Sequence, residues 1–482
     1  MNSTKLAVIG AGPGGYAAAF FAADLGIDVT LIDPEPNPGG VCLYRGCIPS
    51  KALLHAANVI DESRRASALG IEFGQPRIEF TKLRGWKDAV IKRFANGLGQ
   101  VARQRKVTYL QGRASLLDAN TAQVDMAGGG QQVVRFEYAI LATGSRPARV
   151  PSLSLNSSRI LDSTAALELQ EVPRNLLIVG GGYIGLELGT VYATFGSAVT
   201  IVEMTSGLLP GADRDLVAPV ARRMEQLCKA VFLDTKVTAL EEDGSGIAAT
   251  FEGPKVAEPH QLFDRVLISV GRVPNSDIPG LEQTKVKRGP RGFIEVDASR
   301  RTAEHSIFAI GDVVGEPMLA HKASHEARVA VEAAIGGRSV FEPAAIPAVV
   351  FTDPELAWCG LTEQQARSEG RNIEVARFPW AASSRSITLD RTDGVTKMIV
   401  DPVTERVLGV GMAGPGAGEL IAEGVLAVEM GATVTDLKLT IHPHPTLSET
   451  IMESAEVFFG QSTHVYKPKK PKVEPQPQSE VK

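Results

Sequence analysis

A unit made of a strand, a glycine-rich turn, a helix and a second strand occurs twice in this chain of 482 residues. The first copy reads KLAVIGAGPGGYAAAFFAADLGIDVTLID, with an apolar strand over residues 6–9. Gly10 permits a tight turn, Gly12 lets a pyrophosphate approach the backbone, and Gly15 lets helix and strand pack closely. The second strand ends at Asp33, eighteen residues after Gly15, where an acid can accept a hydrogen bond from a ribose hydroxyl. The unit therefore predicts a dinucleotide site with the pyrophosphate at the helix N-terminus.

The second copy, NLLIVGGGYIGLELGTVYATFGSAVTIVEM, repeats the pattern with Gly180, Gly182 and Gly185. The acid Glu203 again stands eighteen residues beyond the last glycine. A carboxylate there can bond both ribose hydroxyls of NAD, whereas it repels the 2′-phosphate of NADP, which an arginine would accommodate. The nearest arginine downstream is Arg214, too distant in the sequence for that contact. The sequence therefore predicts a second dinucleotide site that prefers NAD over NADP.

The stretch GGVCLYRGCIPSK places Cys42 and Cys47 five residues apart and contains half of the four cysteines of the chain. On a regular helix this spacing separates the two residues by about 7.5 Å along the axis and turns them apart, whereas a disulfide needs Cα atoms about 4.4–6.8 Å apart. A bonded pair therefore excludes a continuous helix, and Gly46 can relax the backbone between them. Pro49 suits the first turn of a helix that continues through SKALLHAANVI, whose unpaired N–H groups would favour a thiolate at Cys47. Two free, buried cysteines are the alternative to a redox pair.

Two segments outside the glycine units carry further candidate residues. TAEHSIFAIGDVVG places Asp312 at the end of an apolar strand, and a helix that begins near Ala320 could direct its positive end toward an anion beside that acid. IHPHPTLSET places Glu449 five residues after His444 at a helix-start pattern, so the acid can turn back toward the imidazole. A carboxylate on one ring nitrogen makes the other nitrogen a better base. The alternatives to these functional roles are that Asp312 only starts a turn and that His444 is an ordinary loop histidine.

Composition excludes several classes of partner. The formal net charge of −5 gives no electrostatic reason to expect nucleic acid or an anionic membrane as a partner. No apolar run approaches the roughly 20 residues of a membrane span, and glycines and a proline interrupt the apolar N-terminal stretch where a signal peptide would be continuous. No metal site is predicted at His442 and His444, because no further ligand lies at a suitable spacing. With 482 residues, 44% of them hydrophobic, the chain is expected to form about three domains. A cytoplasmic location is expected.

Together these motifs resemble the flavoprotein disulfide reductases, a pyridine nucleotide-disulfide oxidoreductase family in which the dihydrolipoamide dehydrogenases match best. The resemblance extends from about Lys5 to about Phe459, with the motifs in the family's order: GAGPGG, GGVCLYRGCIPSK, ATGSRP, GGGYIGLELG, GRVPN, AIGDVVG, MLAHK and HPHPTLSE. It implies an α/β fold with two Rossmann-like dinucleotide-binding domains, for FAD and NAD, and a C-terminal α+β dimerisation domain. The implied division is an FAD-binding domain over 1–149, an NAD-binding domain over 150–274, a second FAD-binding and central segment over 275–345, an interface domain over 346–466 and a disordered tail over 467–482.

The resemblance also implies roles for individual residues. The expected FAD contacts are Gly10, Gly12, Gly15, Asp33, Gly40, Lys51, Ala114, Gly144, Asp312 and Ala320. The expected NAD contacts are Gly180, Gly182, Gly185, Glu203, Val237 and Gly271. A disulfide between Cys42 and Cys47 is implied, in which Cys42 exchanges with substrate and Cys47 passes electrons to FAD. Lys51 is expected to pair with Glu187 beside the reactive flavin nitrogen, and His444 is expected to act as a base oriented by Glu449.

The implied reaction is the oxidation of protein-bound dihydrolipoamide to lipoamide with reduction of NAD⁺ to NADH. In the family the His/Glu loop completes the site of the other subunit, so a homodimer with shared active sites is expected. The other expected partners are lipoyl domains of acyltransferases or glycine-cleavage carrier proteins, and the peripheral-subunit-binding domain of a 2-oxo acid dehydrogenase complex. Tyr44 and Arg45 depart from the family's small polar Asn and apolar residue, which could alter the redox potential or substrate entry.

Other functions fit the sequence less well. Glutathione reductase is the runner-up within the family, but Glu203 favours NAD and the PSK tripeptide fits the lipoamide enzymes better. A mercuric reductase would carry a second cysteine pair near the C-terminus, and no cysteine follows Cys359. A transhydrogenase of similar fold is expected to lack the redox cysteine pair. A structural subunit without catalysis is disfavoured by the intact cysteine pair and the intact His/Glu pair.

Overall fold

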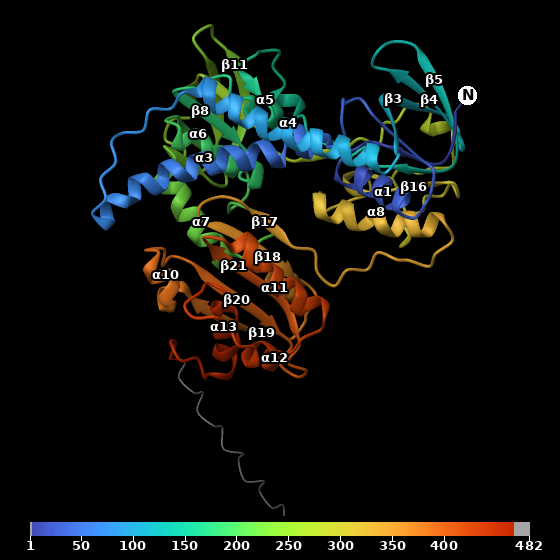
Figure 1. The fold of residues 1–482 in the computed structure, drawn as a ribbon. Coiled ribbons are helices and arrows are strands. Elements are labelled where there is room, and N and C mark those ends of the chain that lie inside the picture. Colours follow the sequence, from blue (N-terminus) through green and yellow to red (C-terminus); the bar gives the residue numbers. More distant parts are fainter. Residues whose placement is uncertain (1, 467–482) are drawn as a thin grey trace, which may run out of the picture. The chain divides into compact units, whose positions relative to one another are not determined.

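The computed structural model describes residues 2–466 and divides them into two compact units (Figure 1). The first unit comprises the chain up to Pro210 together with Ala221–Pro343, and the second comprises Gly211–Val220 and the residues from Ala344 onward. The predicted α/β fold is confirmed, whereas the assignment of Gly211–Val220 to the second unit was not expected. The finer five-part division stays a prediction, and its tail over 467–482 lies outside the described residues.

Strand β1, the first strand of the first glycine unit, is the centre of a six-stranded sheet. Strands β3, β2, β1, β5 and β16 pair in parallel in that order, and β4 joins β3 to β5 by antiparallel pairing. The bounds are β1 (Asn2–Ile9), β2 (Val29–Asp33), β3 (Thr108–Asp118), β4 (Thr121–Met126), β5 (Gln131–Leu141) and β16 (Ile307–Ala309). β1 begins four residues before the predicted strand, and β2 ends at Asp33 as predicted. Because parallel strands share a carboxyl edge, the glycine turn and this acid lie together.

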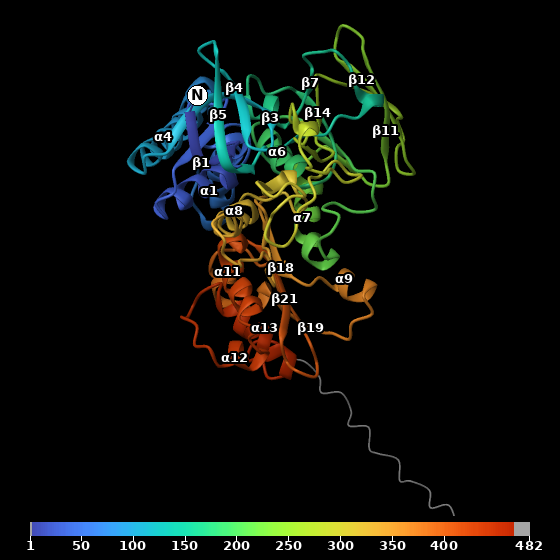
Figure 2. The same cartoon turned by 90° about the vertical axis from the view of Figure 1, so that its right-hand side faces the viewer.

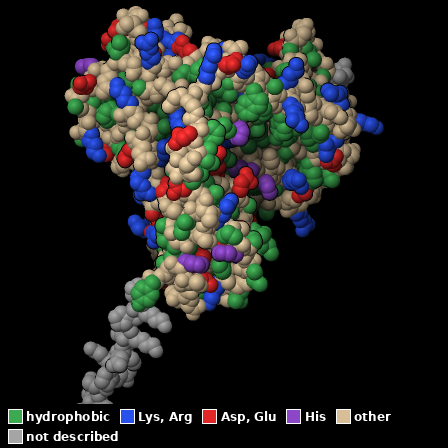
Figure 3. Space-filling view, turned by 60° about the vertical axis from the view of Figure 1, so that its left-hand side comes forward, with side chains coloured by type: hydrophobic (Ala, Val, Ile, Leu, Met, Phe, Trp, Pro, Cys, Tyr) green, Lys and Arg blue, Asp and Glu red, His purple; other side chains and the backbone are tan. Residues whose placement is uncertain are grey.

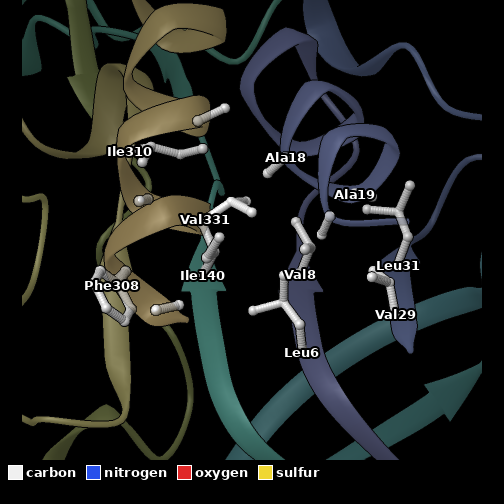
Figure 4. Packing of buried hydrophobic residues seen from close by; sticks show 14 of the residues in the cluster. Leu6, Val8, Ala18, Ala19, Val29, Leu31, Ile140, Phe308, Ile310 and Val331 are labelled. Atoms are coloured by element: carbon white, nitrogen blue, oxygen red, sulfur yellow. The ribbon is translucent and has the colours of Figure 1, made fainter. Parts of the chain in front are cut away.

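Small residues let two helices pack closely against this sheet. Helices α1 (Pro13–Asp24) and α8 (Ala320–Ala334) lie side by side, with a buried apolar cluster beneath them (Figures 2 and 4). In Figure 4, Ala18 of α1 and Val331 of α8 lie near Val8 and Ile140 of the strands. The small side chains permit this close approach, which brings the first residues of both helices to the wall of one cavity.

The second glycine unit forms a five-stranded, wholly parallel sheet in the same compact unit, in the order β10-β9-β8-β14-β7. Its strands are β7 (Ile160–Leu161), β8 (Asn175–Val179), β9 (Ala198–Val202), β10 (Ala230–Phe232) and β14 (Arg265–Ile268). Helix α6 (Tyr183–Thr194) follows β8, and α5 (Ser163–Glu168) follows β7. A three-stranded antiparallel sheet contains β11 (Lys236–Glu242), β12 (Ile247–Glu252) and β13 (His260–Phe263), and a two-stranded ribbon contains β6 (Ser145–Pro147) and β15 (Arg272–Pro274).

The cysteine stretch forms two consecutive helices. Helix α2 (Gly40–Arg45) ends at Gly46, whose backbone leaves helical geometry, and α3 (Cys47–Arg65) begins directly afterwards. Pro49 lies in the first turn of α3, as the sequence predicted. The long helix α4 (Phe80–Gln104) packs against α3, and Figure 1 shows the two side by side. Helix α3 also packs against α6, which joins the cysteine stretch to the second glycine unit.

The second compact unit is an antiparallel five-stranded sheet with helices packed on it, in the strand order β17-β18-β21-β20-β19. Its strands are β17 (Ala348–Val350), β18 (Glu355–Gly360), β19 (Glu374–Pro379), β20 (Val395–Val400) and β21 (Val407–Gly414). Its helices are α9 (Glu363–Ser368), α10 (Ser384–Thr388), α11 (Ala417–Glu429), α12 (Val434–Leu439) and α13 (Glu449–Phe459). Helices α11 and α13 bury apolar residues against the sheet. This is the α+β architecture that the sequence predicted for the C-terminal region.

Buried ion pairs explain why Gly211–Val220 belongs to the second unit. The segment contains the start of helix α7 (Arg214–Leu227). The Lys397 ammonium on β20 is 1% exposed and lies 2.7 Å from Asp213 and 2.9 Å from Asp215. It also lies 2.5 Å from Glu363, so a cation occupies the centre of these three acids. The arrangement satisfies buried charges and offers no reason to place a metal ion among them.

The surface of the described residues carries both signs of charge. On the face drawn in Figure 3, Lys and Arg side chains are interspersed with Asp and Glu side chains. Among residues 2–466, no helix combines the length and the apolar character that crossing a membrane requires.

Candidate active site

A cavity of about 790 Å³ in the first unit collects most residues that were predicted to contact FAD. Those in its wall are Gly10, Gly12, Asp33, Gly40, Lys51, Ala114, Gly144, Asp312 and Ala320. Gly15 is the exception, because it lies beneath the turn, where an added Cβ would come 1.8 Å from the carbonyl oxygen of Gly10. Both cysteines of the pair line the same cavity. The cavity therefore joins a glycine cradle to a pair of thiols.

The glycine turn leaves room for a pyrophosphate. A Cβ at Gly12 would meet nothing within 4 Å, so the backbone there faces open space. A Cβ at Gly40 would lie 2.5 Å from the Cα of Gly12, so only glycine lets helix α2 start this close to the turn. The carboxylate of Asp33 accepts hydrogen bonds from the N–H of Ala11 at 2.7 Å and of Glu35 at 2.9 Å, although burial raises its pKa. These features fit the adenosine and pyrophosphate parts of FAD.

Glu203 repeats the geometry of Asp33 at the second glycine unit. One oxygen of its carboxylate accepts from the N–H of Gly181 at 2.6 Å. The other accepts from the N–H and the hydroxyl of Thr205, each at 2.8 Å. A Cβ at Gly182 would again face open space. The acid is therefore oriented beside an open glycine turn, which fits the ribose and pyrophosphate of NAD.

The predicted NAD contacts lie outside the cavity described above. Val237 has its side chain 4% exposed within an apolar cluster, so it can offer a nucleotide only its backbone. Gly271 has a left-handed backbone, and a Cβ there would meet nothing within 4 Å. The second glycine unit still reaches the cavity, because Tyr183 and Ile184 at the start of α6 line its wall. Tyr183 was missed by the sequence reasoning, although it directly follows a cradle glycine.

Cys42 and Cys47 are free thiols in this structure, joined by a hydrogen bond. The break at Gly46 turns the end of α2 so that the two side chains meet. The hydrogen bond with Cys42 and the charge of Lys51 lower the pKa of Cys47 to about 7 despite its desolvation, and the same hydrogen bond raises the pKa of Cys42. Cys47 is also the first residue of α3, where unpaired N–H groups favour an anion. These contacts favour Cys47 over Cys42 as the thiolate of the reduced pair, and the disulfide of the oxidised pair stays a prediction.

Lys51 and Glu187 form the ion pair that the family resemblance implied. The Lys51 ammonium lies 2.8 Å from the Glu187 carboxylate and joins α3 to α6 across 136 residues of sequence. The Glu187 side chain is only 5% exposed, so the carboxylate needs this cation. Both residues line the cavity, and Lys51 follows Cys47 by one turn of α3. The pair can therefore adjust the potential of a redox group bound beside the thiolate.

Asp312 is held by two residues that the sequence reasoning did not single out. Its carboxylate accepts a hydrogen bond from the hydroxyl of Ser145 at 2.5 Å. That hydroxyl accepts in turn from the guanidinium of Arg272 at 2.7 Å. A signal was present, because the motifs ATGSRP and GRVPN place Ser145 and Arg272 directly after apolar strands. The resulting chain fixes the direction in which Asp312 faces the cavity.

A buried ionic cluster holds the backbone before Asp312. The carboxylate of Glu326 on α8 is fully buried and accepts from the N–H of Gly311 at 2.6 Å. Lys322, at 3.0 Å, and Arg300, at 3.2 Å, supply its counter-charges. The Lys322 ammonium also donates to the carbonyl of Gly311 at 3.4 Å. The sequence signal was a Lys–Glu pair four residues apart within a helix of small residues.

Replacing Glu326 by Ala is expected to lower the free energy of unfolding by about 3–5 kcal/mol, because the buried Lys322 and the partly buried Arg300 would lose their counter-charge. Urea-induced unfolding followed by tryptophan fluorescence would measure this loss. Lys82→Ala is the matched control: it removes an exposed ion pair with Glu79 and should cost no more than about 1 kcal/mol. Equal effects of the two substitutions would contradict a stabilising role for the buried cluster.

Tyr44 and Arg45, which depart from the family pattern, both contact the loop that follows β2. The Tyr44 hydroxyl donates to the carbonyl of Asn37 at 3.0 Å. The Arg45 guanidinium lies 2.5 Å from the Glu35 carboxylate, and Arg45 and Glu35 both line the cavity. The two residues therefore tie the helix that carries Cys42 to the loop beside Asp33.

The second unit carries the predicted His/Glu pair. The Nδ1 atom of His444 lies 2.9 Å from the carboxylate of Glu449, the first residue of α13. The other carboxylate oxygen accepts from the N–H of Thr446 at 2.8 Å, which fixes the acid. Because Nδ1 donates to the acid, the Nε2 atom of His444 carries the lone pair. The His444 side chain is 63% exposed, so this nitrogen is available as a base.

Comparison with known proteins finds two family models along the chain. The pyridine nucleotide-disulphide oxidoreductase model matches residues 4–327, and the dimerisation domain model of the same name matches residues 346–455. The chain is 47% identical over 460 residues to the dihydrolipoyl dehydrogenase of Haemophilus influenzae, covering 95% of this chain and 96% of that protein. It is 45% identical over 462 residues to the dihydrolipoyl dehydrogenase of Geobacillus stearothermophilus, covering 96% and 97%.

Solved structures of similar fold also cover nearly the whole chain. LpdA from Mycobacterium tuberculosis superposes with a TM-score of 0.86 at 26% identity, covering 94% of this chain and 99% of that one. The HOCl-induced flavoprotein disulfide reductase RclA from Escherichia coli superposes with a TM-score of 0.81 at 28% identity, covering 93% and 98%.

Proposed function

The chain belongs to the pyridine nucleotide-disulphide oxidoreductase family, and from this premise we propose that it oxidises protein-bound dihydrolipoamide to lipoamide with reduction of NAD⁺ to NADH. The observation that carries the proposal is the thiol pair in the wall of the cavity. Cys47 stands at the start of α3 with a lowered pKa, and Cys42 beside it keeps its proton. When the pair is oxidised to a disulfide, a low pKa makes Cys47 the better leaving group, which suits attack by a substrate thiolate at Cys42.

The cavity supports FAD as the redox group next to the thiols. Gly12 and Asp33 would hold its adenosine and pyrophosphate parts, while Asp312 and the first turn of α8 would face the remainder. Bound FAD would supply a two-electron acceptor for the Cys47 thiolate and a hydride donor for NAD⁺. The residues of the second glycine unit would hold NAD⁺, since Tyr183 brings that unit to the cavity wall.

The thiol exchange follows from the assigned protonation states. His444 takes a proton from one thiol of dihydrolipoamide, because only a thiolate attacks a disulfide efficiently. The substrate thiolate attacks the sulfur of Cys42, the Cys42–Cys47 bond breaks, and Cys47 leaves as a thiolate. The second substrate thiol transfers its proton to the leaving Cys42 as its sulfur attacks the mixed disulfide, which releases lipoamide. Re-forming the Cys42–Cys47 disulfide releases two electrons and the proton of Cys42, which together equal the hydride that reduces NAD⁺. The other proton leaves to solvent from His444.

A second copy of the chain is the first partner, since residues 346–455 match a dimerisation domain. The second unit exposes several apolar side chains, each more than 60% exposed: Leu426, Met430, Leu439 and Ile441. Exposed apolar side chains in this number favour burial by a second chain. In the proposed dimer, His444 and Glu449 act on the cysteine pair of the partner subunit. Lipoyl domains and the peripheral-subunit-binding domain of a 2-oxo acid dehydrogenase complex are the further proposed partners.

A single comparison of substrates tests this function. Purified protein should be yellow, and it should oxidise dihydrolipoamide with NAD⁺ much faster than with NADP⁺. NADPH-linked reduction of glutathione disulfide, measured beside it, should be at background level. A colourless, flavin-free protein, or faster turnover of glutathione disulfide, would refute the proposal.

Glu203→Arg is expected to raise the KM for NAD⁺ by about 10–100-fold, because it removes charge-assisted hydrogen bonds to the ribose. The arginine should at the same time improve the use of NADP⁺, whose 2′-phosphate it can bind. Steady-state kinetics with both nucleotides would measure the change. Glu241→Arg, an exposed acid on β11, is the control for the change in net charge. An unchanged preference for NAD⁺ in Glu203→Arg would mean that the ribose contact lies elsewhere.

A further inference from the structure

The loop over residues 440–446, which carries His444, has a second histidine that the proposed reaction does not use. The imidazole of His442 has only 5% of its surface exposed, whereas its neighbour Ile441 is 95% exposed. Isoleucine is usually buried more often than histidine, so a buried imidazole beside an exposed isoleucine is the reverse of the usual order. The buried polar ring therefore needs specific partners.

Both ring nitrogens of His442 have such partners. Nδ1 lies 2.9 Å from the carbonyl oxygen of Thr440, and Nε2 lies 2.8 Å from the Glu423 carboxylate on α11. A carbonyl oxygen only accepts, so Nδ1 must be the donor there. The hydrogen bond between Nε2 and the Glu423 carboxylate also contains one proton, because an ionised carboxylate and an unprotonated nitrogen can both only accept. The ring is thereby fixed in position and in orientation.

The contacts of His442 complete the support of the loop. At its start, Thr440 is tied to the end of α12 through its N–H and its hydroxyl, both donated to Asp436. At its end, Thr446 is tied to Glu449 and to the carbonyl of Pro443. The two prolines of the HPHP sequence have no N–H to donate, so backbone hydrogen bonds cannot replace these side-chain contacts. His442 is the anchor that joins the loop to α11.

We propose that His442 is a positioning residue for His444: through Glu423 it joins the loop to α11 and holds the base at one place. The inference rests on the proposed function, in which His444 is the base. A displacement of a reacting group by about 1 Å can cost about a hundredfold in rate. His442→Ala and Glu423→Ala are therefore each expected to lower kcat for dihydrolipoamide oxidation by about 10–100-fold.

The conservative variant separates position from charge. In Glu423→Gln the amide can donate to Nε2 of a neutral imidazole, so the contact and the loop position persist. Glu423→Gln should therefore keep kcat within about threefold of the parent protein, whereas Glu423→Ala should not. Equal losses in the two variants would overturn the proposal.

A double-mutant cycle tests whether His442 acts through the base. In a His444→Gln background, His442→Ala should cause no further loss of dihydrolipoamide oxidation, because the group that it positions is gone. NADH oxidation by an artificial quinone, which needs no base on a substrate thiol, should be unchanged in every variant. Additive losses, or a parallel loss of quinone reduction, would show a merely structural role and refute the proposal.

The chain offers a matched control and a check on the premise. His464 also pairs with a glutamate of the second unit, at 2.5 Å from Glu453, but lies beyond α13 and outside the loop. His464→Gln should leave kcat unchanged, and sedimentation should show the parent oligomeric state for all variants. Full activity of His444→Gln would refute the proposed function itself, whereas additivity with an inactive His444→Gln refutes only the positioning role.

Discussion

Cys47→Ser is expected to abolish NAD-linked oxidation of dihydrolipoamide, with a fall in kcat of at least about a thousandfold. A serine hydroxyl can neither form the disulfide nor leave as a stable anion near neutral pH, so no path for electrons into the cavity remains. Stopped-flow and steady-state assays would measure the loss. Direct reduction of an artificial quinone by NADH should survive, because it does not pass through the thiol pair.

Cys228→Ser is the matched control for this substitution. Cys228 is buried outside the cavity, and burial raises its pKa to about 12, so its thiol stays protonated. Its replacement should leave turnover unchanged. Substantial dihydrolipoamide oxidation by Cys47→Ser would contradict the relay assigned to the cavity.

The ionisation of Cys47 adds a pH dependence with a definite sign. Because the folded protein lowers its pKa to about 7, the thiolate predominates above that pH and is lost as the pH falls through it. The long-wavelength absorbance between thiolate and flavin in the two-electron-reduced protein should decline over the same range. Cys42→Ala has no disulfide to reduce, so its absorbance is read with oxidised flavin; it removes the hydrogen bond that lowers the pKa of Cys47 most, so the decline should move to higher pH. An unshifted titration would assign the thiolate to another group.

His444→Gln is expected to lower kcat for dihydrolipoamide oxidation by about 10²–10⁴-fold, the usual contribution of a general base. Glutamine keeps the approximate size of the ring and can still bond Glu449, so the fold and the dimer should persist. The loss should be smaller near pH 9, where substrate thiols ionise without help. A pH series of steady-state rates would measure both effects. A rate equal to the parent's at pH 7 would exclude His444 as the base.

The local part of the fold was predictable because its constraints act over about thirty residues. A strand, three glycines at fixed spacing and a following acid define each dinucleotide unit, and both units form as expected. A helix break between the cysteines was expected only for a bonded pair, with Gly46 as the residue that could relax the backbone, and the structure has the break at Gly46. The pairing of His444 with Glu449 was predictable because five residues and a helix start separate them.

The long-range contacts of the site were not predictable from local pattern. The pairing of Lys51 with Glu187 spans 136 residues and was expected only from the family resemblance. The hydrogen bond from Ser145 to Asp312 spans 167 residues, and it was missed. Each contact depends on which elements become neighbours when helices and sheets pack. The spacing of residues along the sequence does not show which elements these will be.

The sequence by itself determined the chemistry of this protein: two dinucleotide cradles, a thiol pair at a helix start, and a histidine beside an acid. Only the tertiary structure brought the Cys42 thiol across a break in the helix to Cys47, and this hydrogen bond lowers the pKa of Cys47 most. It also decided that His442 faces Glu423 on another helix while Ile441 faces outward. Protonation and orientation are set by the atoms around a group, and most of those atoms come from distant parts of the chain.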